Sequence, residues 1–256
     1  NGLIPEHSAL LKIHKPNSAQ DVKDARHRLA FDELFTIQLA AYFTRKHWDQ
    51  EKVGNSLKVE PFKQKIEEFI QALPYNLTNG QNKTIEEILL DIAKTKPMNR
   101  FLQGDVGSGK TVVAAIASYV TYLNGYRTLV MAPTEILAQQ HYETFTKLFK
   151  NTEVKVALIT GGKSYKVSRI SYKDKIPNTE YAIRNTDIVI GTQALLHRAL
   201  NVKKIGLVII DEQHRFGVKQ RSQLKQIGIN PHLLTMTATP IPRTAALTIF
   251  GELDMS

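Results

Sequence analysis

The spacing of hydrophobic residues changes near residue 100. Before that point, apolar residues recur every three or four positions, as on one face of an α-helix. The spacing predicts one long amphipathic helix over residues 21–48, a second around Phe62–Leu73 that ends before Pro74, and a third around Ile85–Ile92. Residues 1–30 contain Pro5, Pro16 and a polar stretch, which predict an extended linker leading into the first helix.

After residue 100, short apolar runs alternate with helical patterns. The runs predict strands at 99–103, 127–131, 154–159, 187–190, 207–210 and 233–236, and a helix at 112–123. Nearly continuous apolar strands of this length indicate a parallel sheet that is covered on both faces. We therefore expect a linker and helical extension over residues 1–75, followed by one α/β lobe over residues 76–256.

A glycine-rich segment lies between the predicted strand 99–103 and the helix that follows it. Its sequence, GDVGSGKT, fits the pattern G-x-x-x-x-G-K-[ST], in which backbone N–H groups wrap the phosphates of a nucleotide. Lys110 would reach the β- and γ-phosphates, and the Thr111 hydroxyl would meet Mg²⁺. A helix N-terminus also favours negative charge. The alternative is a flexible surface turn.

The run LVIIDEQH, residues 207–214, brings two acids to the end of a predicted buried strand. Asp211 and Glu212 follow four apolar residues, so we expect one carboxylate to bind the metal and the other to act on the attacking water. The alternative is a solvated acidic pair. Together with the glycine-rich loop, the pair indicates an enzyme that cleaves nucleoside triphosphates.

Thr78 and Gln81 precede the third predicted helix and fit the capping box T-x-x-Q, in which each side chain binds a backbone N–H group. The Gln81 amide also offers one donor and one acceptor, which match the N6/N7 edge of adenine. The sequence leaves both roles open. The nucleotide-binding residues that we predict are Leu77, Gln81, Gly104, Asp105, Val106, Gly107, Ser108, Gly109, Lys110 and Thr111.

Several other polar loops follow predicted strands, and ligands of open α/β sheets bind at that carboxyl edge. Thr134 can cap a helix, or the same free N–H groups can hold a phosphate of a nucleic-acid backbone. The candidate nucleic-acid contacts are Pro133, Thr134, Gly161, Gly162 and Thr192. The turn Thr237–Thr244 follows the last strand, near the predicted position of Asp211.

The chain carries a formal net charge of +10, and most of the excess lies in its second part. Residues 101–256 hold 19 Lys and Arg against 11 Asp and Glu, which suggests a polyanion partner such as nucleic acid, or an ordinary solvated face. The lack of cysteine excludes disulfides, thiol catalysis and thiolate metal sites. No apolar run approaches the roughly 18 residues of a membrane span, so we expect a cytoplasmic protein without membrane contacts.

Five segments occur along the chain in the order GDVGSGKT, MAPTEILAQQH, VIGTQALL, VIIDEQHRFGVKQR and MTATPIPRT. Together they resemble the first motor lobe of a superfamily 2 helicase, and more narrowly the RecG-type ATP-dependent DNA helicases of bacteria. ARHRLAFDELFTIQL and LPYNLTNGQ resemble the stretch before that motor. The resemblance implies a RecA-like P-loop lobe that uses ATP and Mg²⁺. It also implies action on duplex and branched DNA, with branch migration and regression of stalled forks.

The resemblance also assigns roles to residues. Lys110 would stabilise the charge that develops on the γ-phosphate, Thr111 and Asp211 would hold Mg²⁺, and Glu212 would orient and deprotonate water. The predicted catalytic residues are Lys110, Asp211, Glu212 and His214. The residues predicted to couple the γ-phosphate to the rest of the lobe are Gln213, His214, Thr237 and Thr239.

Some features depart from the family. Gly80 replaces a common Ala, and residues 163–180 match poorly, so DNA contacts there are not assigned. We expect the chain to be a piece of a longer protein, with a second motor lobe and an N-terminal wedge domain elsewhere in it. Two alternatives remain open. One is the transcription-repair coupling factor, whose acidic motif is typically DEEH where this chain has Gln213. The other is a nucleotide- or DNA-binding module without catalysis.

Overall fold

The computed structural model describes residues 2–50, 56–160, 165–168, 185–192, 195, 204–211, 231–238 and 254–255. These residues divide into two compact units. The first contains the described residues up to Gln50, and the second contains those from 56 to 238 together with 254–255.

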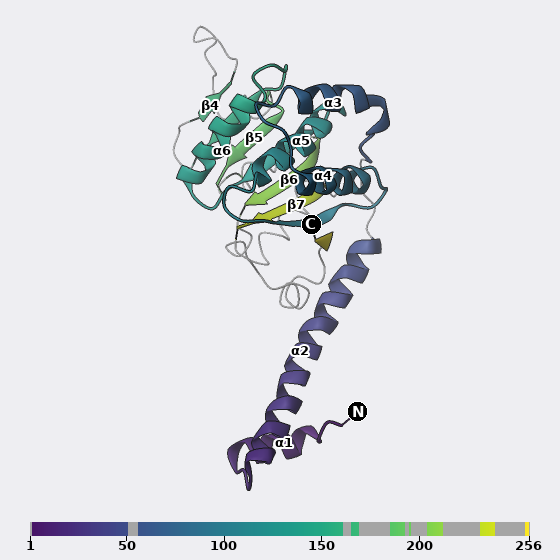
Figure 1. Cartoon of the computed structure of the whole chain (residues 1–256), viewed down its shortest axis with the longest axis vertical. Coiled ribbons are helices and arrows are strands. Elements are labelled where there is room, and N and C mark those ends of the chain that lie inside the picture. The colour runs from purple at the N-terminus through teal and green to yellow at the C-terminus, as the bar shows by residue number, and fades with distance from the viewer. Residues whose placement is uncertain are drawn as a thin grey trace. The chain divides into compact units, whose positions relative to one another are not determined.

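The first unit consists of two helices, α1 (Glu6–His14) and α2 (Ala19–Gln50) (Figure 1). The prediction of an extended linker was wrong for residues 6–14. Pro5 is the N-cap residue of α1 and Pro16 follows its C-cap, so the prolines flank the helix, where their missing N–H groups disrupt no helical hydrogen bond. Ala9 and Ala25 are fully buried, and Lys12 forms a 2.7 Å ion pair with Asp21.

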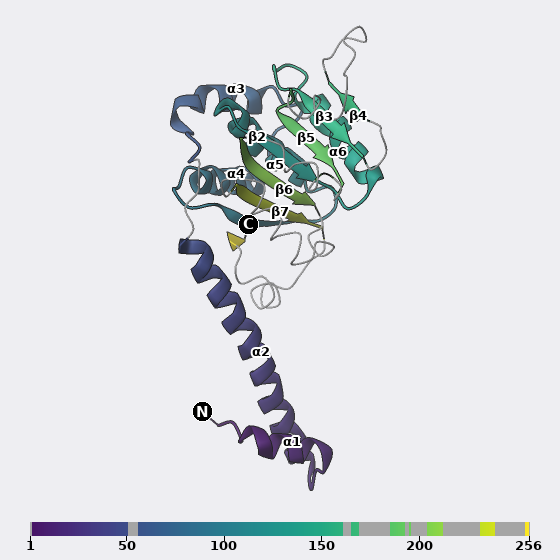
Figure 2. The same cartoon turned by 180° about the vertical axis from the view of Figure 1, so that it is seen from behind.

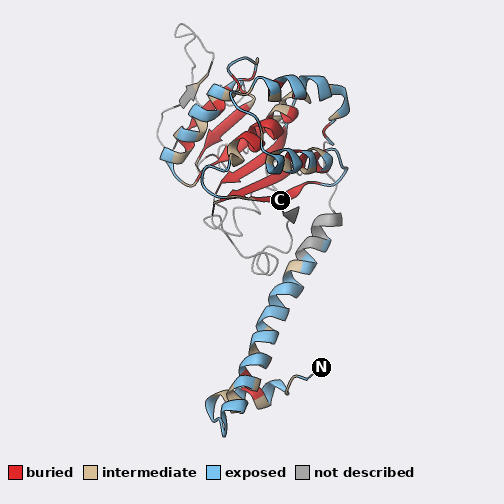
Figure 3. Cartoon of the chain, viewed as in Figure 1, coloured by how far each residue is buried: buried red, intermediate tan, exposed pale blue. Residues whose placement is uncertain are grey.

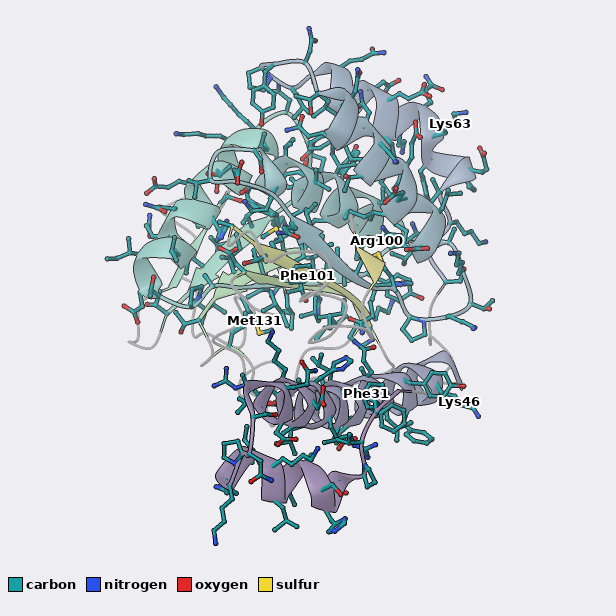
Figure 4. The ribbon with its side chains drawn as sticks, turned by 60° about the horizontal axis from the view of Figure 1, so that its bottom comes forward. Phe31, Lys46, Lys63, Arg100, Phe101 and Met131 are labelled. Carbon is teal, nitrogen blue, oxygen red and sulfur yellow. The ribbon has the colours of Figure 1, made fainter. Side chains whose placement is uncertain are left out.

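Helix α2 contains the predicted helix 21–48 and extends two residues beyond it at each end. Most of its described side chains are exposed (Figure 3). The exposed residues include Phe31 and Phe35, whose rings stack at 5.9 Å; Phe31 is labelled in Figure 4. Within the described residues, no helix is both long enough and apolar enough to cross a membrane.

The second unit is built on an eight-stranded sheet with the order β4-β3-β5-β2-β6-β7-β1-β8. Its strands are β1 (Asn99–Gln103), β2 (Arg127–Met131), β3 (Val156–Ile159), β4 (Tyr165–Val167), β5 (Ile188–Gly191), β6 (Ile205–Asp211), β7 (His232–Thr237) and β8 (Asp254–Met255). All neighbouring strands pair in parallel except β3 and β4, which are antiparallel at the edge. The predicted parallel sheet is confirmed, and β4 and β8 are additions to it.

Within the described residues, four α-helices and a short 3-10 helix lie on one side of this sheet (Figures 1 and 2); two of the helices contact the strands, and the other elements pack around these two. The helices are η1 (Glu60–Phe62), α3 (Lys63–Gln71), α4 (Asn79–Ile92), α5 (Lys110–Leu123) and α6 (Glu135–Leu148). Alternate strand residues point to opposite faces: Val130 joins the core beneath the helices, whereas Leu129 and Met131 join a second buried cluster. The described strands and α5 are largely buried (Figure 3), which explains why their sequences are apolar without alternation.

Residues 56–75 pack onto the α/β lobe. The Leu57 N–H donates to the Ile92 carbonyl at 3.1 Å, and the Phe69 ring stacks on Tyr119 at 4.5 Å and on Phe149 at 5.1 Å. Ile66 and Phe69 are buried in the same core as α5. The boundary that we expected at residue 75 therefore falls inside one compact unit, because helix α3 buries its apolar face against the lobe.

A buried ion-pair cluster joins strand β1 to helix α4. Arg100 and Phe101 are neighbours on β1 and point to opposite faces (Figure 4). The Arg100 guanidinium lies 2.6 Å from Asp91 and 2.8 Å from Glu87, and Lys94 also pairs with Asp91. Burial raises the pKa of Asp91, but hydrogen bonds and charges from Lys94 and Arg100 outweigh it and hold this pKa below its usual value.

Candidate nucleotide-binding site

The predicted site residues meet at the carboxyl edge of the sheet because the parallel strands end level with one another. Gln103 at the end of β1 pairs with Thr237 at the end of β7, and Asp211 at the end of β6 pairs with Met236. The loop after β2 lies on the same edge, since the Ala132 N–H donates to the Gly191 carbonyl at 2.9 Å. Segments far apart in the sequence thus come to one edge.

The glycine-rich loop connects β1 to α5, as predicted. At its start, the Gly104 N–H donates to the Thr237 carbonyl at 3.3 Å. Gly107 and Gly109 have φ angles of +83°, a left-handed conformation that favours glycine. The loop can therefore turn sharply just before the first residue of α5. Its backbone leads directly into the N-terminus of that helix.

Lys110 is the first residue of α5, and its ammonium group lies against the loop. The Nζ atom donates to the Gly104 carbonyl at 2.7 Å and to the Asp105 carbonyl at 2.9 Å. These bonds hold a positive charge beside the backbone N–H groups of a helix N-terminus. Thr111 follows as the second residue of the helix. The combination suits a phosphate group, because the helix dipole and the ammonium group act in the same direction.

Gln81 links the start of helix α4 to the glycine-rich loop. The side-chain Oε1 atom of Gln81 accepts from the backbone N–H of Thr78 at 2.8 Å, and the backbone N–H of Gln81 donates to Thr78 Oγ1 at 3.2 Å. The predicted capping box is therefore confirmed. In addition, Gln81 Nε2 donates to the Ser108 carbonyl at 2.8 Å, a contact that the sequence did not predict. Leu77, one residue before the cap, packs against the core.

Gly109 gives Gln81 the room for this contact. A Cβ atom at Gly109 would overlap Gln81 Nε2, and the positive φ angle disfavours any side chain there. The second glycine of the motif therefore serves both the turn of the loop and the approach of the Gln81 amide. Whether Gln81 also contacts adenine stays a prediction.

Asp211 ends strand β6 and is 8% exposed. Its Oδ2 atom lies 2.7 Å from Nε2 of His141, which comes from helix α6. His141 ends the segment MAPTEILAQQH, but it was not among the site residues predicted from the sequence. No local pattern links residues 70 positions apart in the sequence, so only the fold reveals this pair.

The loop between β2 and α6 supports one of the two roles that the sequence allowed for Thr134. Its Oγ1 atom accepts from the Leu137 N–H at 3.3 Å, which confirms the helix cap. Pro133 is half-buried and Thr134 is exposed. Thr192 is half-buried, and its carbonyl accepts from the Leu195 N–H at 2.8 Å. Contact of these residues with nucleic acid stays a prediction.

Six predicted site residues lie outside the described part of the chain, and their roles stay predictions. They are Gly161, Gly162, Glu212, Gln213, His214 and Thr239. The described residues nevertheless fit a magnesium nucleotide: the loop and Lys110 suit phosphates, and the oxygens of Thr111 and Asp211 are of the kind that Mg²⁺ prefers.

Comparison with known proteins now identifies the lobe. The family model described as DEAD/DEAH box helicase matches residues 78–248. The chain is 42% identical over 254 residues to the ATP-dependent DNA helicase RecG of Synechocystis sp., and 45% identical over 256 residues to that of Thermotoga maritima. Each match covers 99% of this chain but only 30% and 31% of the relative.

A solved structure agrees with these matches. A structure of RecG bound to a three-way DNA junction covers 99% of this chain and 33% of its own, with 41% identity and a TM-score of 0.78. The chain thus spans about a third of the length of the relatives that it matches. On this evidence the chain belongs to the DEAD/DEAH box helicase family, and within it the chain is similar to the ATP-dependent DNA helicase RecG.

Proposed function

We propose that this chain is the first motor lobe of an ATP-dependent DNA helicase that remodels branched DNA. The observation that carries the proposal is the meeting of the Lys110 loop and Asp211 at one sheet edge. The similarity to RecG supports DNA as the polymer on which the motor acts. Branch migration and regression of stalled forks are the activities that we propose for the whole protein.

The proposed chemistry is transfer of the γ-phosphoryl group of ATP to water. Lys110 would neutralise charge on the transferring phosphoryl group, and Thr111 and Asp211 would hold Mg²⁺. When bound at these two residues, Mg²⁺ would supply positive charge that offsets the negative charge of the phosphates. Glu212 would orient and deprotonate the water. We propose that Gln213 and His214 couple the γ-phosphate to Thr237 and Thr239.

The Gly104–Thr237 hydrogen bond supports part of this coupling. It joins the start of the phosphate loop to the strand that leads into TATPIPRT, so a shift of the loop acts directly on that strand. Pro133, Thr134 and Thr192, which lie on the same edge, are proposed to bind the DNA backbone. Gly161 and Gly162, outside the described residues, are proposed for the same role. A second motor lobe and a wedge domain elsewhere in the protein are further proposed partners.

The experiment is ATP-dependent remodelling of a fork-shaped DNA, followed on gels, with the full-length protein that carries this sequence. Wild type and the Lys83→Ala control, which changes an exposed lysine of α4, should convert the fork when ATP and Mg²⁺ are present. Lys110→Ala should not. ATP-dependent binding of RNA polymerase without fork conversion would favour the coupling-factor alternative, and binding of DNA without ATP turnover would favour a binding module.

A further inference from the structure

His141 belongs to the inner face of helix α6. It lies three residues after Ala138 and four before Phe145, and both of these residues are fully buried. Residues at such spacings share one face of a helix. The His141 side chain itself is only 12% exposed. The imidazole is therefore held by a packed helix and not by a loop, which limits its freedom to move.

Asp211 points toward the same side of the sheet. Leu207 and Ile209 of β6 join the core beneath the helices, and side chains alternate along a strand, so Asp211 shares their face. Strand β6 pairs with β2, the strand that leads into α6. The end of β6 and the inner face of α6 are thereby brought together by the topology of the lobe.

The contact has the geometry of a charge-assisted hydrogen bond. The His141 Nε2 and Asp211 Oδ2 atoms are 2.7 Å apart, within the range of such bonds. A carboxylate can only accept, so the imidazole carries its proton on Nε2 and donates it. This bond limits rotation of the Asp211 carboxylate, because one of its two oxygens is hydrogen-bonded to His141 of α6.

From this geometry, and resting on the proposed magnesium role of Asp211, we propose that His141 is a positioning residue of the nucleotide site. It orients the Asp211 carboxylate before metal binding and does not touch the reacting atoms. Groups that hydrogen-bond to metal-ligating side chains typically contribute 10–100-fold to metal affinity or activity. We expect loss of the Nε2 donor to weaken the metal site by this factor.

The test measures binding of Mn²⁺ by electron paramagnetic resonance, in the presence of ADP, with the full-length protein. Mn²⁺ serves as the probe for the magnesium site. His141→Leu removes the donor at similar size and should raise the Mn²⁺ Kd about 10–100-fold. His141→Gln keeps an N–H donor close to the position of Nε2, so its Kd should stay within about threefold of wild type. Thr144→Ala, at an exposed position of α6, is the matched control and should leave the Kd unchanged.

His141→Asn keeps the test decisive if the leucine variant does not fold. Its amide is polar but too short to place a donor at Nε2, so it should bind Mn²⁺ more weakly than His141→Gln. Equal Mn²⁺ affinities of the glutamine and asparagine variants, or an unchanged affinity of a folded leucine variant, would overturn the proposal.

The Asp211→Asn variant distinguishes failure of this proposal from failure of the proposed function on which it rests. If wild type shows no Mn²⁺ binding that depends on Asp211, the proposed nucleotide site itself fails. If that binding is present and His141→Leu leaves it intact, only the positioning role of His141 is refuted.

Discussion

The contact between Gly109 and Gln81 predicts that substitutions at these two positions are strongly coupled. Gly109 has φ +83° and ψ +23°, where alanine costs about 1–2 kcal/mol of backbone strain. Its new Cβ would also displace the Gln81 amide. The displaced amide would lose its bonds to the Thr78 N–H and the Ser108 carbonyl, each 2.8 Å long. Each bond contributes a net 0.5–1.5 kcal/mol, about 1–3 kcal/mol together.

These magnitudes define a double-mutant cycle. Gly109→Ala should destabilise the lobe by about 2–5 kcal/mol, the sum of strain and the two lost bonds. Gln81→Ala removes the same two bonds and should cost about 1–3 kcal/mol. In the double variant the bonds are lost only once. Its destabilisation should therefore be smaller than the sum of the two single destabilisations by about 1–3 kcal/mol.

The assay is equilibrium unfolding of the 256-residue chain in urea, followed by circular dichroism, for the wild type, both single variants and the double variant. Gly125→Ala is a matched control: this glycine also has a positive φ of +74°, but a Cβ there would meet no atom within 4 Å. Gly125→Ala and Gln81→Ala should therefore be additive. Additivity within about 0.5 kcal/mol for Gly109 and Gln81 would refute the contact.

Three further predictions concern nucleotide choice, pH and the isolated chain. If Gln81 reads adenine, as predicted, Gln81→Ala should weaken binding of ATP more than binding of GTP, measured with fluorescent analogues; an equal loss for both nucleotides would leave the amide with only its bonds to Thr78 and Ser108. The lowered pKa of Asp91 stabilises the fold above about pH 4, and this contribution is lost as pH falls through the folded-state value. Arg100→Met should therefore cost about 3 kcal/mol at pH 7 and clearly less at pH 3, measured by urea unfolding. The isolated chain should hydrolyse ATP about 10³–10⁵-fold more slowly than the full-length protein with branched DNA, since we expect the second motor lobe to supply an arginine finger that stabilises the transition-state charge; rates within about tenfold would contradict this.

Hydrophobic periodicity was sufficient for most of the lobe. The limits of β1 and β2 match the predicted strands, because each has a short apolar centre, Phe101–Leu102 and Leu129–Met131, and the glycine-rich loop directly follows β1. Helix α1 was missed for a local reason. Prolines and polar residues are typical of linkers, yet Pro5 and Pro16 flank a helix of nine residues without interrupting it.

Strand β8 was missed because two residues carry no periodic signal. The domain division at residue 75 stays a prediction, and an amphipathic helix such as α3 does not show in its sequence which surface it packs against. Only the structure shows that Phe69 meets Tyr119 and Phe149.

The candidate site likewise contains parts that the sequence predicted and contacts that it did not predict. The phosphate loop, the capping box and the strand that ends in Asp211 are local patterns, so the sequence predicted where they lie. The contacts of Gln81 with Ser108 and of His141 with Asp211 join residues 27 and 70 positions apart. Such contacts depend on the order of the strands and helices in the folded lobe. Local patterns in one sequence do not reveal that order.

We propose that Lys110 and Asp211 form the catalytic half of an ATP-hydrolysing motor. The most direct test is steady-state hydrolysis of Mg²⁺-ATP by the full-length protein, with and without saturating branched DNA. Wild type should hydrolyse ATP and be stimulated by the DNA, whereas Lys110→Ala and Asp211→Asn should fall to background while circular dichroism shows that both variants are folded. Wild-type turnover in either variant, with the fold intact, would contradict the account.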